Sequence, residues 1–187
     1  NQSVDVMDGG HGYNTSSTGF GFDWIVNWLE GAKDVISVVD KNDSNISHLY
    51  VLSTQSSTIA WIRHSNNFGV ISYDYIKYDP LDPFALNFLN GLNSIAISPD
   101  EKHVYISADV NESVSWFERN STNGILKYSG TLDQSSNGLD ASDMVVSLDG
   151  KNVYVTSYAN QSVSWFDRNS STGALTYSAS LKHGVAG

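Results

Sequence analysis

The sequence predicts an all-β fold built from β-propeller blades, and three observations support this prediction. A block of sequence recurs along the chain at a constant offset. Each copy holds short runs of alternating apolar and β-branched residues separated by turn residues, which is typical of strands. The period of roughly 45–50 residues leaves room for four antiparallel strands, which is the content of one propeller blade.

The last two copies of this block are very similar, and every matched segment recurs 49 residues further on. The matched pairs are Ser98–Ser107 with Ser147–Thr156, Asn111–Asn120 with Asn160–Asn169, and Thr122–Tyr128 with Ser171–Tyr177. Repetition at this length predicts that each copy folds into the same structural unit.

An earlier copy is more divergent, and a partial copy precedes it. The earlier copy aligns with the next one at an offset of 55 residues, through Tyr50 with Tyr105, Trp61 with Trp116, Gly69 with Gly124 and Tyr73 with Tyr128. The partial copy is marked by two short matches, Asn1–Val4 with Asn160–Val163 and Ser17–Gly19 with Ser171–Gly173. The chain therefore contains about three and a half copies.

Four strands are expected in the best-defined copy, at Ser94–Ser98, His103–Ser107, Ser113–Glu118 and Ile125–Thr131. The pairs Pro99-Asp100 and Asn123-Gly124 favour tight turns between them, as does Asp149-Gly150 in the following copy.

Both faces of the predicted sheets should be buried. Trp116 and Phe117 are adjacent, so their side chains point to opposite faces of a strand, yet both are large and apolar. Blades that stack around an axis bury both faces. A β-sandwich is the competing all-β arrangement, but it does not require a repeat of this length.

Val153–Thr156, Ser162–Arg168 and Ser171–Thr176 together resemble the YVTN-type repeat of lactonase-like β-propellers. The resemblance covers residues 35–183 and implies a ring of about seven blades. Some members of this class are phosphogluconolactonases or carboxymuconate-cyclising enzymes, with acidic, basic and arginine side chains over the channel. None of those catalytic residues matches a position here, and the repeated Arg119 and Arg168 lie at the end of the third strand, away from the axis.

We divide the chain into an outer half-blade plus connector at 1–34, blades at 35–90 and 91–137, and a blade with the start of the next connector at 138–187. Such a row would leave an apolar blade face uncovered at each end. We therefore expect either further blades of a longer chain or copies of the chain that complete one another's sheets.

Composition excludes several classes of protein. The chain has 187 residues, with 20 acidic and 10 basic side chains and a formal charge of −10. Nucleic-acid binding is excluded because neutralising phosphates needs an excess of Lys and Arg. The absence of Cys excludes disulfides and thiolate metal sites. No apolar run approaches the roughly 18 residues of a membrane-spanning helix.

The expected function is non-catalytic. The sequence has no nucleophile elbow, phosphate loop or dinucleotide fingerprint. No catalytic residue, cofactor or metal is predicted. We expect an extracellular structural or adhesive module that assembles with further blades or with copies of itself. Two alternatives remain open: a lactonase-like hydrolase or cyclase with its site over the propeller channel, and a carbohydrate-binding propeller lectin.

N-glycosylation sequons are more frequent than the composition requires, although the repeat itself copies several of them. They begin at Asn1, Asn14, Asn42, Asn45, Asn111, Asn120, Asn160 and Asn169. Glycans at these positions would place the protein outside the cell. The alternative is that Asn and Ser are simply good turn formers.

Two connectors between blades are rich in aromatic residues, with Trp24 and Trp28 in the first and Phe84 and Phe88 in the second. Connectors of this kind cross the face around the channel mouth. The aromatic side chains are therefore candidates for contact with a partner or a carbohydrate. The alternative is that they fill the gap between blades.

Two further motifs have simpler explanations. Asp40–Asn45 resembles the start of a calcium loop, but Asn45 stands where such a loop needs Gly, so a long turn is the better interpretation. His11 lies in the glycine-rich segment Asp8–Gly12, which fits a hairpin loop.

Overall fold

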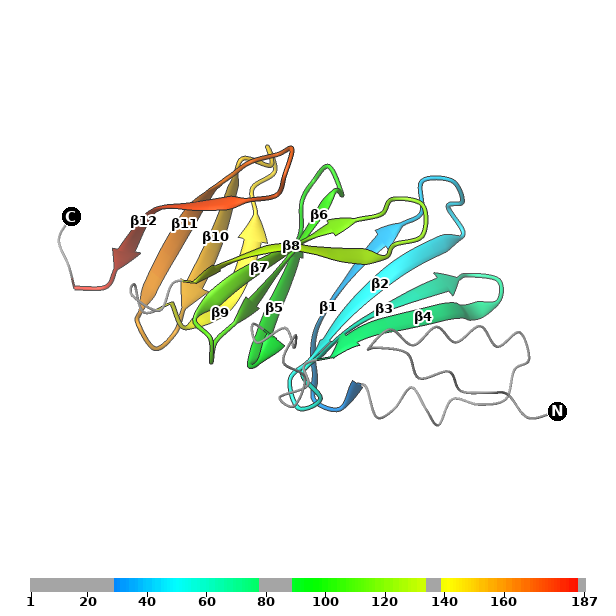
Figure 1. Cartoon of the computed structure of the whole chain (residues 1–187), viewed down its shortest axis with the longest axis horizontal. Helices are drawn as coiled ribbons and strands as arrows, with labels where there is room; N and C mark the ends of the chain where they lie inside the picture. Colours follow the sequence, from blue (N-terminus) through cyan, green and yellow to red (C-terminus); the bar gives the residue numbers. More distant parts are fainter. Residues whose placement is uncertain (1–28, 78–88, 134–138, 185–187) are drawn as a thin grey trace.

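The computed structural model describes residues 29–77, 89–133 and 139–184, which form three four-stranded antiparallel sheets (Figure 1). The first sheet contains β1 (Ala32–Val39), β2 (Ile46–Ser53), β3 (Thr58–Ser65) and β4 (Gly69–Lys77). The second contains β5 (Leu92–Ile97), β6 (His103–Ala108), β7 (Ser113–Arg119) and β8 (Leu126–Asp133). The third contains β9 (Ala141–Val146), β10 (Asn152–Ser157), β11 (Ser162–Arg168) and β12 (Leu175–Lys182).

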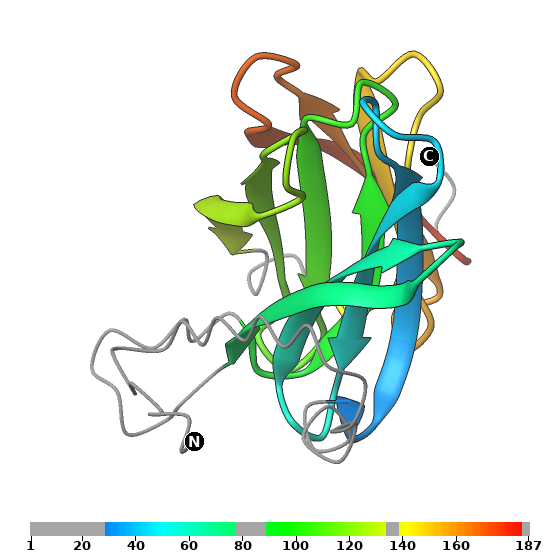
Figure 2. The same ribbon diagram turned by 90° about the vertical axis from the view of Figure 1, so that its right-hand side faces the viewer.

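Each sheet is a meander in which strands consecutive in the chain are hydrogen-bonded neighbours. The first strand of the middle sheet, β5, contacts β1 on one side and β9 on the other, and the sheets lie side by side (Figures 1 and 2). This is the arrangement of propeller blades, with the first strand of each blade nearest the axis. The prediction of an all-β propeller segment is therefore confirmed.

The two faces of each sheet carry different residues. We name them after the tyrosine of the second strand, Tyr50 or Tyr105, and the phenylalanine of the third strand, Phe117 or Phe166. The Tyr face of the first sheet contains Ile36, Tyr50, Ile59 and Trp61, and that of the second contains Ala96, Tyr105, Val114 and Trp116. The Phe face of the second sheet contains Ile95, Val104, Ile106, Phe117 and Leu126, and that of the third contains Met144, Val153, Val155, Phe166 and Leu175.

The core lies between the sheets, where a Tyr face packs on the Phe face of the next blade. One apolar cluster joins the first and second sheets and a second cluster joins the second and third. Trp116 belongs to one cluster and Phe117 to the other, and both are buried. The prediction that these adjacent side chains serve opposite faces is confirmed.

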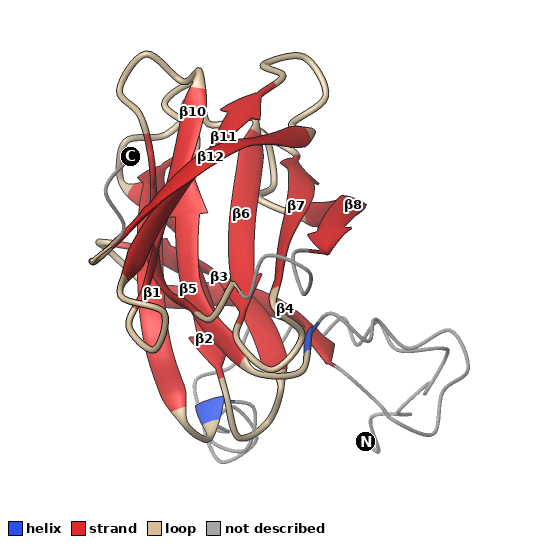
Figure 3. Ribbon diagram, turned by 90° about the vertical axis from the view of Figure 1, so that its left-hand side faces the viewer, coloured by secondary structure: helices blue, strands red, loops and turns tan. Residues whose placement is uncertain are grey.

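Several sequence predictions lie outside the described residues. Almost all of the half-blade expected at 1–34 lies outside the described residues, and so do the aromatic parts of both connectors. Strands make up most of the described chain (Figure 3). Among the described residues, no helix has the length and apolar character needed to cross a membrane.

Candidate functional site

The innermost strands place three polar side chains in one row. Asp34, Ser94 and Asp143 each occupy the third position of β1, β5 and β9, respectively. The first strands of propeller blades surround the central channel, so this row belongs to the channel wall. It lies near the end of the channel at which the chain enters each blade.

Hydrogen bonds join this row across the three sheets. The Ser94 Oγ lies 3.1 Å from the Asp34 Oδ2 and 2.9 Å from the Asp143 Oδ1. Because a hydroxyl has a single hydrogen, the two carboxylates share this donor. The Ile95 amide also donates to Asp34 at 2.9 Å, and the Met144 amide donates to Asp143 at 2.8 Å. The backbone therefore fixes both carboxylates in place.

The two acids differ in their accessibility. Asp34 is half-buried, whereas Asp143 is exposed. The hydrogen bonds that hold Asp143 in the row use its Oδ1. The side chain is therefore oriented through one oxygen. It lies on the same side of β9 as Val145, where no blade packs among the described residues, and this accounts for its exposure. A carboxylate held in this way can accept a proton from water or a hydrogen bond from a substrate hydroxyl.

A second polar cluster joins the first and second blades away from the axis. Arg119, the last residue of β7, donates from its Nε to the Tyr50 Oη at 2.7 Å, and its Nη2 lies 2.7 Å from the His48 Nδ1. The Tyr50 hydroxyl donates in turn to the Gly124 carbonyl at 2.7 Å. We call this set the Arg–Tyr–His clasp.

The same clasp joins the second and third blades. Arg168 at the end of β11 donates from its Nε to the Tyr105 Oη at 2.7 Å, and its Nη2 lies 2.9 Å from the His103 Nδ1. Tyr105 donates to the Gly173 carbonyl at 2.9 Å. In this clasp Asp100 also accepts from Arg168, with its two oxygens at 3.0 and 3.1 Å from Nη2.

The clasps shift the pKa values of their members. Burial raises the pKa of Tyr50 and of Tyr105 to about 12, so both stay protonated and can donate. Burial and the neighbouring arginine lower the pKa of His48 and of His103, which favours neutral imidazole. Burial acts to raise the pKa of Asp100, but hydrogen bonds from its neighbours and the arginine charge outweigh it and hold this pKa at about 2.

The sequons among the described residues lie in turns between strands. Asn42 and Asn45 are exposed in the β1–β2 turn. Exposed Asn120 and Asn169 occupy the β7–β8 and β11–β12 turns, where the side-chain oxygen of each accepts two backbone amide hydrogens. The other two described positions, Asn111 and Asn160, are half-buried in the β6–β7 and β10–β11 turns.

The remaining candidates are not brought together by the described structure. Asn1 and Asn14 lie outside the described residues, as do Trp24, Trp28, Phe84 and Phe88. His11 lies outside them as well. Within the described ranges, no group of His, Cys, Asp and Glu has the geometry of a metal site.

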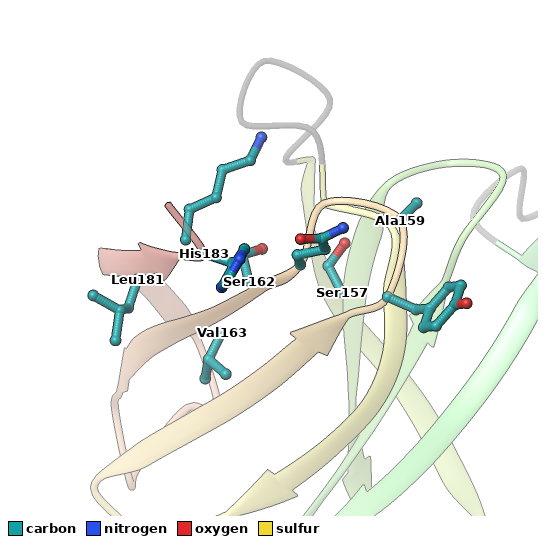
Figure 4. A pocket seen from close by; sticks show the side chains of 9 residues that line it. Ser157, Ala159, Ser162, Val163, Leu181 and His183 are labelled. Atoms are coloured by element: carbon teal, nitrogen blue, oxygen red, sulfur yellow. The ribbon is translucent and has the colours of Figure 1, made fainter. Parts of the chain in front are cut away.

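One open depression lies on the third blade, beside the β10–β11 hairpin (Figure 4). Its lining includes Ser157, Ala159, Ser162, Val163, Leu181 and His183. Val163 and Leu181 are paired across β11 and β12 and belong to the Tyr face of this blade. The residues that line it do not include Asp34, Ser94 or Asp143.

Sequence reasoning missed both the channel-wall row and the clasps. The row could have been found by aligning the third residue of each inner strand, because Ser94 and Asp143 are separated by the repeat length of 49. The clasps have a clearer signal. His48 and His103 each stand two residues before the aligned tyrosine, and Arg119 and Arg168 recur with the block.

The three stacked four-stranded sheets define a β-propeller segment. Residues 41–184, more than half of the chain, match the family described as Lactonase, 7-bladed beta-propeller, and the chain belongs to this family. The resemblance noted in the sequence is thereby confirmed. A comparison with curated proteins finds no match.

Solved structures share the fold at low sequence identity. A putative 6-phosphogluconolactonase from Bacteroides fragilis is similar with a TM-score of 0.66 and 20% identity, over 82% of this chain and 40% of that protein. The periplasmic gluconolactonase of Pseudomonas aeruginosa gives a TM-score of 0.66 and 14% identity, also over 82% and 40%. A putative 6-phosphogluconolactonase from Bacteroides uniformis gives 0.65 and 18%, over 82% and 41%. The chain thus spans about two fifths of the length of these proteins.

The expectation of a non-catalytic structural or adhesive module was wrong. The family match and the lactonase names of the similar structures favour the alternative of a lactonase-like hydrolase. The lack of a contiguous catalytic motif is not a sufficient reason for a non-catalytic function in this family. A channel site is assembled from single residues on separate blades, so it leaves no contiguous motif.

Proposed function

We propose that this chain forms part of a lactonase-like hydrolase whose substrate binds at the propeller channel. The observation that carries the proposal is the hydrogen-bonded row of Asp34, Ser94 and Asp143 on the channel wall. Membership of the lactonase family gives the reaction class. The names of the similar structures suggest sugar lactones as substrates.

Hydrolysis of a lactone needs a base and a proton donor. The oxygen of water adds to the carbonyl carbon, the bond from that carbon to the ring oxygen breaks, and a hydroxy acid is released. A base takes a proton from the water, and the ring oxygen receives a proton as it leaves. Asp143, whose carboxylate is held on this wall by Ser94 and the Met144 amide, is the group that we assign to the base.

Asp34 and Ser94 are positioning residues in this proposal. Ser94 donates to the same Asp143 oxygen that the Met144 amide contacts, so the carboxylate is held at a fixed orientation. Asp34 is held through the same hydroxyl and by the Ile95 amide. Fixed orientation matters because catalysis by proton transfer falls steeply when the base is misplaced.

The test is an assay of the full-length protein on glucono-1,5-lactone and on its 6-phosphate, with acid release followed at constant pH. We expect hydrolysis of at least one of them. Asp143→Asn should lower kcat/KM by about 10²- to 10⁴-fold, the usual contribution of a general base. Asp167→Asn is the matched control, because Asp167 is an exposed carboxylate on β11 of the same blade, away from the inner strand.

The outcomes distinguish a failure of the proposed activity from a failure of the role assigned to Asp143. Hydrolysis of neither lactone by the full-length protein would contradict the proposed function. Equally fast hydrolysis by wild type and Asp143→Asn would support the proposed function but contradict the role of Asp143 as the base. A change in KM alone would make Asp143 a substrate-binding group instead of the base.

We also propose that the protein is secreted and N-glycosylated. Exposed turn positions at Asn42, Asn45, Asn120 and Asn169 support this, because glycans require accessible asparagine side chains. The intact mass of the native protein, before and after removal of N-linked glycans, tests it. A fall in mass supports glycosylation, and an unchanged mass would leave the sequons as turn-forming residues.

A further inference from the structure

The third blade presents a Tyr face that has no blade packed on it within the described residues. By the repeat offset of 49, its residues correspond to the buried Tyr face of the second blade. They are Val145, Tyr154, Val163, Trp165 and Leu181. Tyr154 is 39% exposed, whereas Tyr105 is fully buried. Val163 and Leu181 are 40% and 63% exposed, and they line the depression in Figure 4.

This face also carries most of the acceptor groups of a clasp. Asp149 corresponds to Asp100, which accepts from Arg168 in the second blade. The two carboxylates have the same local bonds. Asp100 accepts from the Ser98 hydroxyl at 2.6 Å and the Lys102 amide at 3.2 Å, while Asp149 accepts from Ser147 at 2.6 Å and from the Lys151 amide at 3.1 Å.

We propose that this face binds a propeller blade that supplies an arginine to Tyr154 and Asp149. That arginine would stand at the end of the third strand of the incoming blade, as Arg119 and Arg168 do in theirs. A glycine carbonyl in the turn that follows this strand would accept a hydrogen bond from the Tyr154 hydroxyl. The Gly124 and Gly173 carbonyls accept in the same way from the Tyr50 and Tyr105 hydroxyls. Both blade interfaces between described sheets contain this arginine, tyrosine and glycine, and the interface between the second and third blades also contains the carboxylate.

Histidine is not needed for this third clasp. Asn152 stands at the position of His48 and His103. Its side-chain Nδ2 donates to Asp167 at 3.1 Å within its own sheet. The side-chain oxygen of Asn152, Oδ1, can accept a hydrogen bond from a guanidinium, as a neutral imidazole nitrogen does. The acidic Asp149 adds charge complementarity for the arginine.

A second copy of the chain does not supply the required arginine. In the first blade, His64 stands at the position of Arg119. In the partial copy that begins at Asn1, Gly9 stands at the position of Arg168. The residues 1–28 contain neither Arg nor Lys. The blade that fits this face therefore lies outside residues 1–187.

The first experiment maps tyrosine nitration by tetranitromethane in the native full-length protein, with mass spectrometry. Tyr158 is the internal reference, because it is 87% exposed in the β10–β11 hairpin of the same blade. We expect loss of reactivity at Tyr154, to the level of the buried Tyr105, with rapid nitration of Tyr158. Nitration of Tyr154 as fast as Tyr158 would overturn the proposal.

The second experiment tests the arginine, using Tyr154→Phe and Tyr158→Phe in the full-length protein. We expect Tyr154→Phe to lower the midpoint of thermal unfolding and Tyr158→Phe to leave it unchanged. If Tyr154 is protected but Tyr154→Phe has no effect, the face is covered without a clasp and the arginine is refuted. Protection that disappears on dilution, together with a fall to the monomer mass, would identify a second copy as the occupant and would also refute the proposal.

Discussion

At the scale of single residues, the buried histidines of the clasps have pKa values lowered by burial and by the neighbouring arginine. His103 faces Arg168 and Lys102 among the cations and Asp100 and Glu118 among the anions. Burial and Arg168 are the strongest influences, and they lower the pKa of the imidazole below its usual value of 6.5. The neutral ring accepts from the guanidinium, so protonation would place two cations against each other.

The resulting prediction concerns the free energy of unfolding in mild acid. Because the folded-state pKa of His103 is lower than that of the unfolded chain, its contribution is complete above pH 6.5 and declines as the pH falls from there toward the folded-state pKa. We expect urea unfolding to show a lower free energy at about pH 5 than at about pH 7.5. Asp100, whose pKa is lowered from 3.8 to about 2, titrates in the separate range below 3.8.

The variant His103→Asn isolates this histidine from the others. Asparagine occupies the same position in the third blade, so the strand accepts it. We expect this variant to lose less free energy of unfolding than wild type between the two pH values. An equal loss in both proteins would show that the acid sensitivity lies elsewhere.

At the scale of elements, the turn between the third and fourth strands is shaped by the blade next to it. Gly124 and Gly173 have φ of +76° and +74° in these turns. A Cβ on Gly173 would lie 2.5 Å from the His103 Cδ2, and one on Gly124 would lie 2.8 Å from the His48 ring. The turns are therefore required to be glycine both by backbone conformation and by contact with a neighbouring sheet.

The first blade offers a matched control for this double requirement. Gly69 occupies the same turn with φ of +76°, and no described atom lies within 4 Å of a Cβ built there. We expect Gly69→Ala to cost about 1 kcal/mol, the penalty of a positive φ. Gly173→Ala should cost about 2–4 kcal/mol, because the histidine must also move. Urea unfolding measures both, and equal costs would show that the contact with His103 is unimportant.

The strands were predictable because their signals are local. Alternation and turn pairs in the block from Ser94 to Thr131 placed four strands within two residues of those observed. The clasps were not predictable from local signals, because Arg119 and His48 are separated by 71 residues and meet only when two blades pack. The channel-wall row required the same knowledge of how the inner strands meet, and its members are not identical residues.

At the scale of the whole molecule, the described blades form a row of similar interfaces. Tyr50 and Tyr105 lie in separate clasps with separate arginines. Repeat proteins of this type are stabilised by a sum of terms from each repeat and from each interface. Stability should then respond to changes at the two interfaces independently.

This independence can be measured with Tyr50→Phe and Tyr105→Phe. Each should lower the free energy of unfolding by about 1–3 kcal/mol, because an arginine donor and a glycine acceptor lose their partner. The double variant should equal the sum within about 0.5 kcal/mol. Combining Tyr105→Phe with Gly173→Ala, which act in one clasp, should depart from the sum. Strong coupling between Tyr50 and Tyr105 would contradict independent interfaces.

The unlike faces of the blades also give the row a polarity. A Tyr face carries hydroxyl and carboxylate acceptors, and the Phe face that covers it brings the arginine. Two Tyr faces placed together would present acceptors to acceptors, with no guanidinium between them. Symmetric, two-fold association through this surface is therefore disfavoured, and contacts are heterologous, from head to tail. Each interface therefore fixes the direction in which the blades follow one another around the axis. A blade in the reverse orientation would place a Tyr face against a Tyr face on one side and a Phe face against a Phe face on the other.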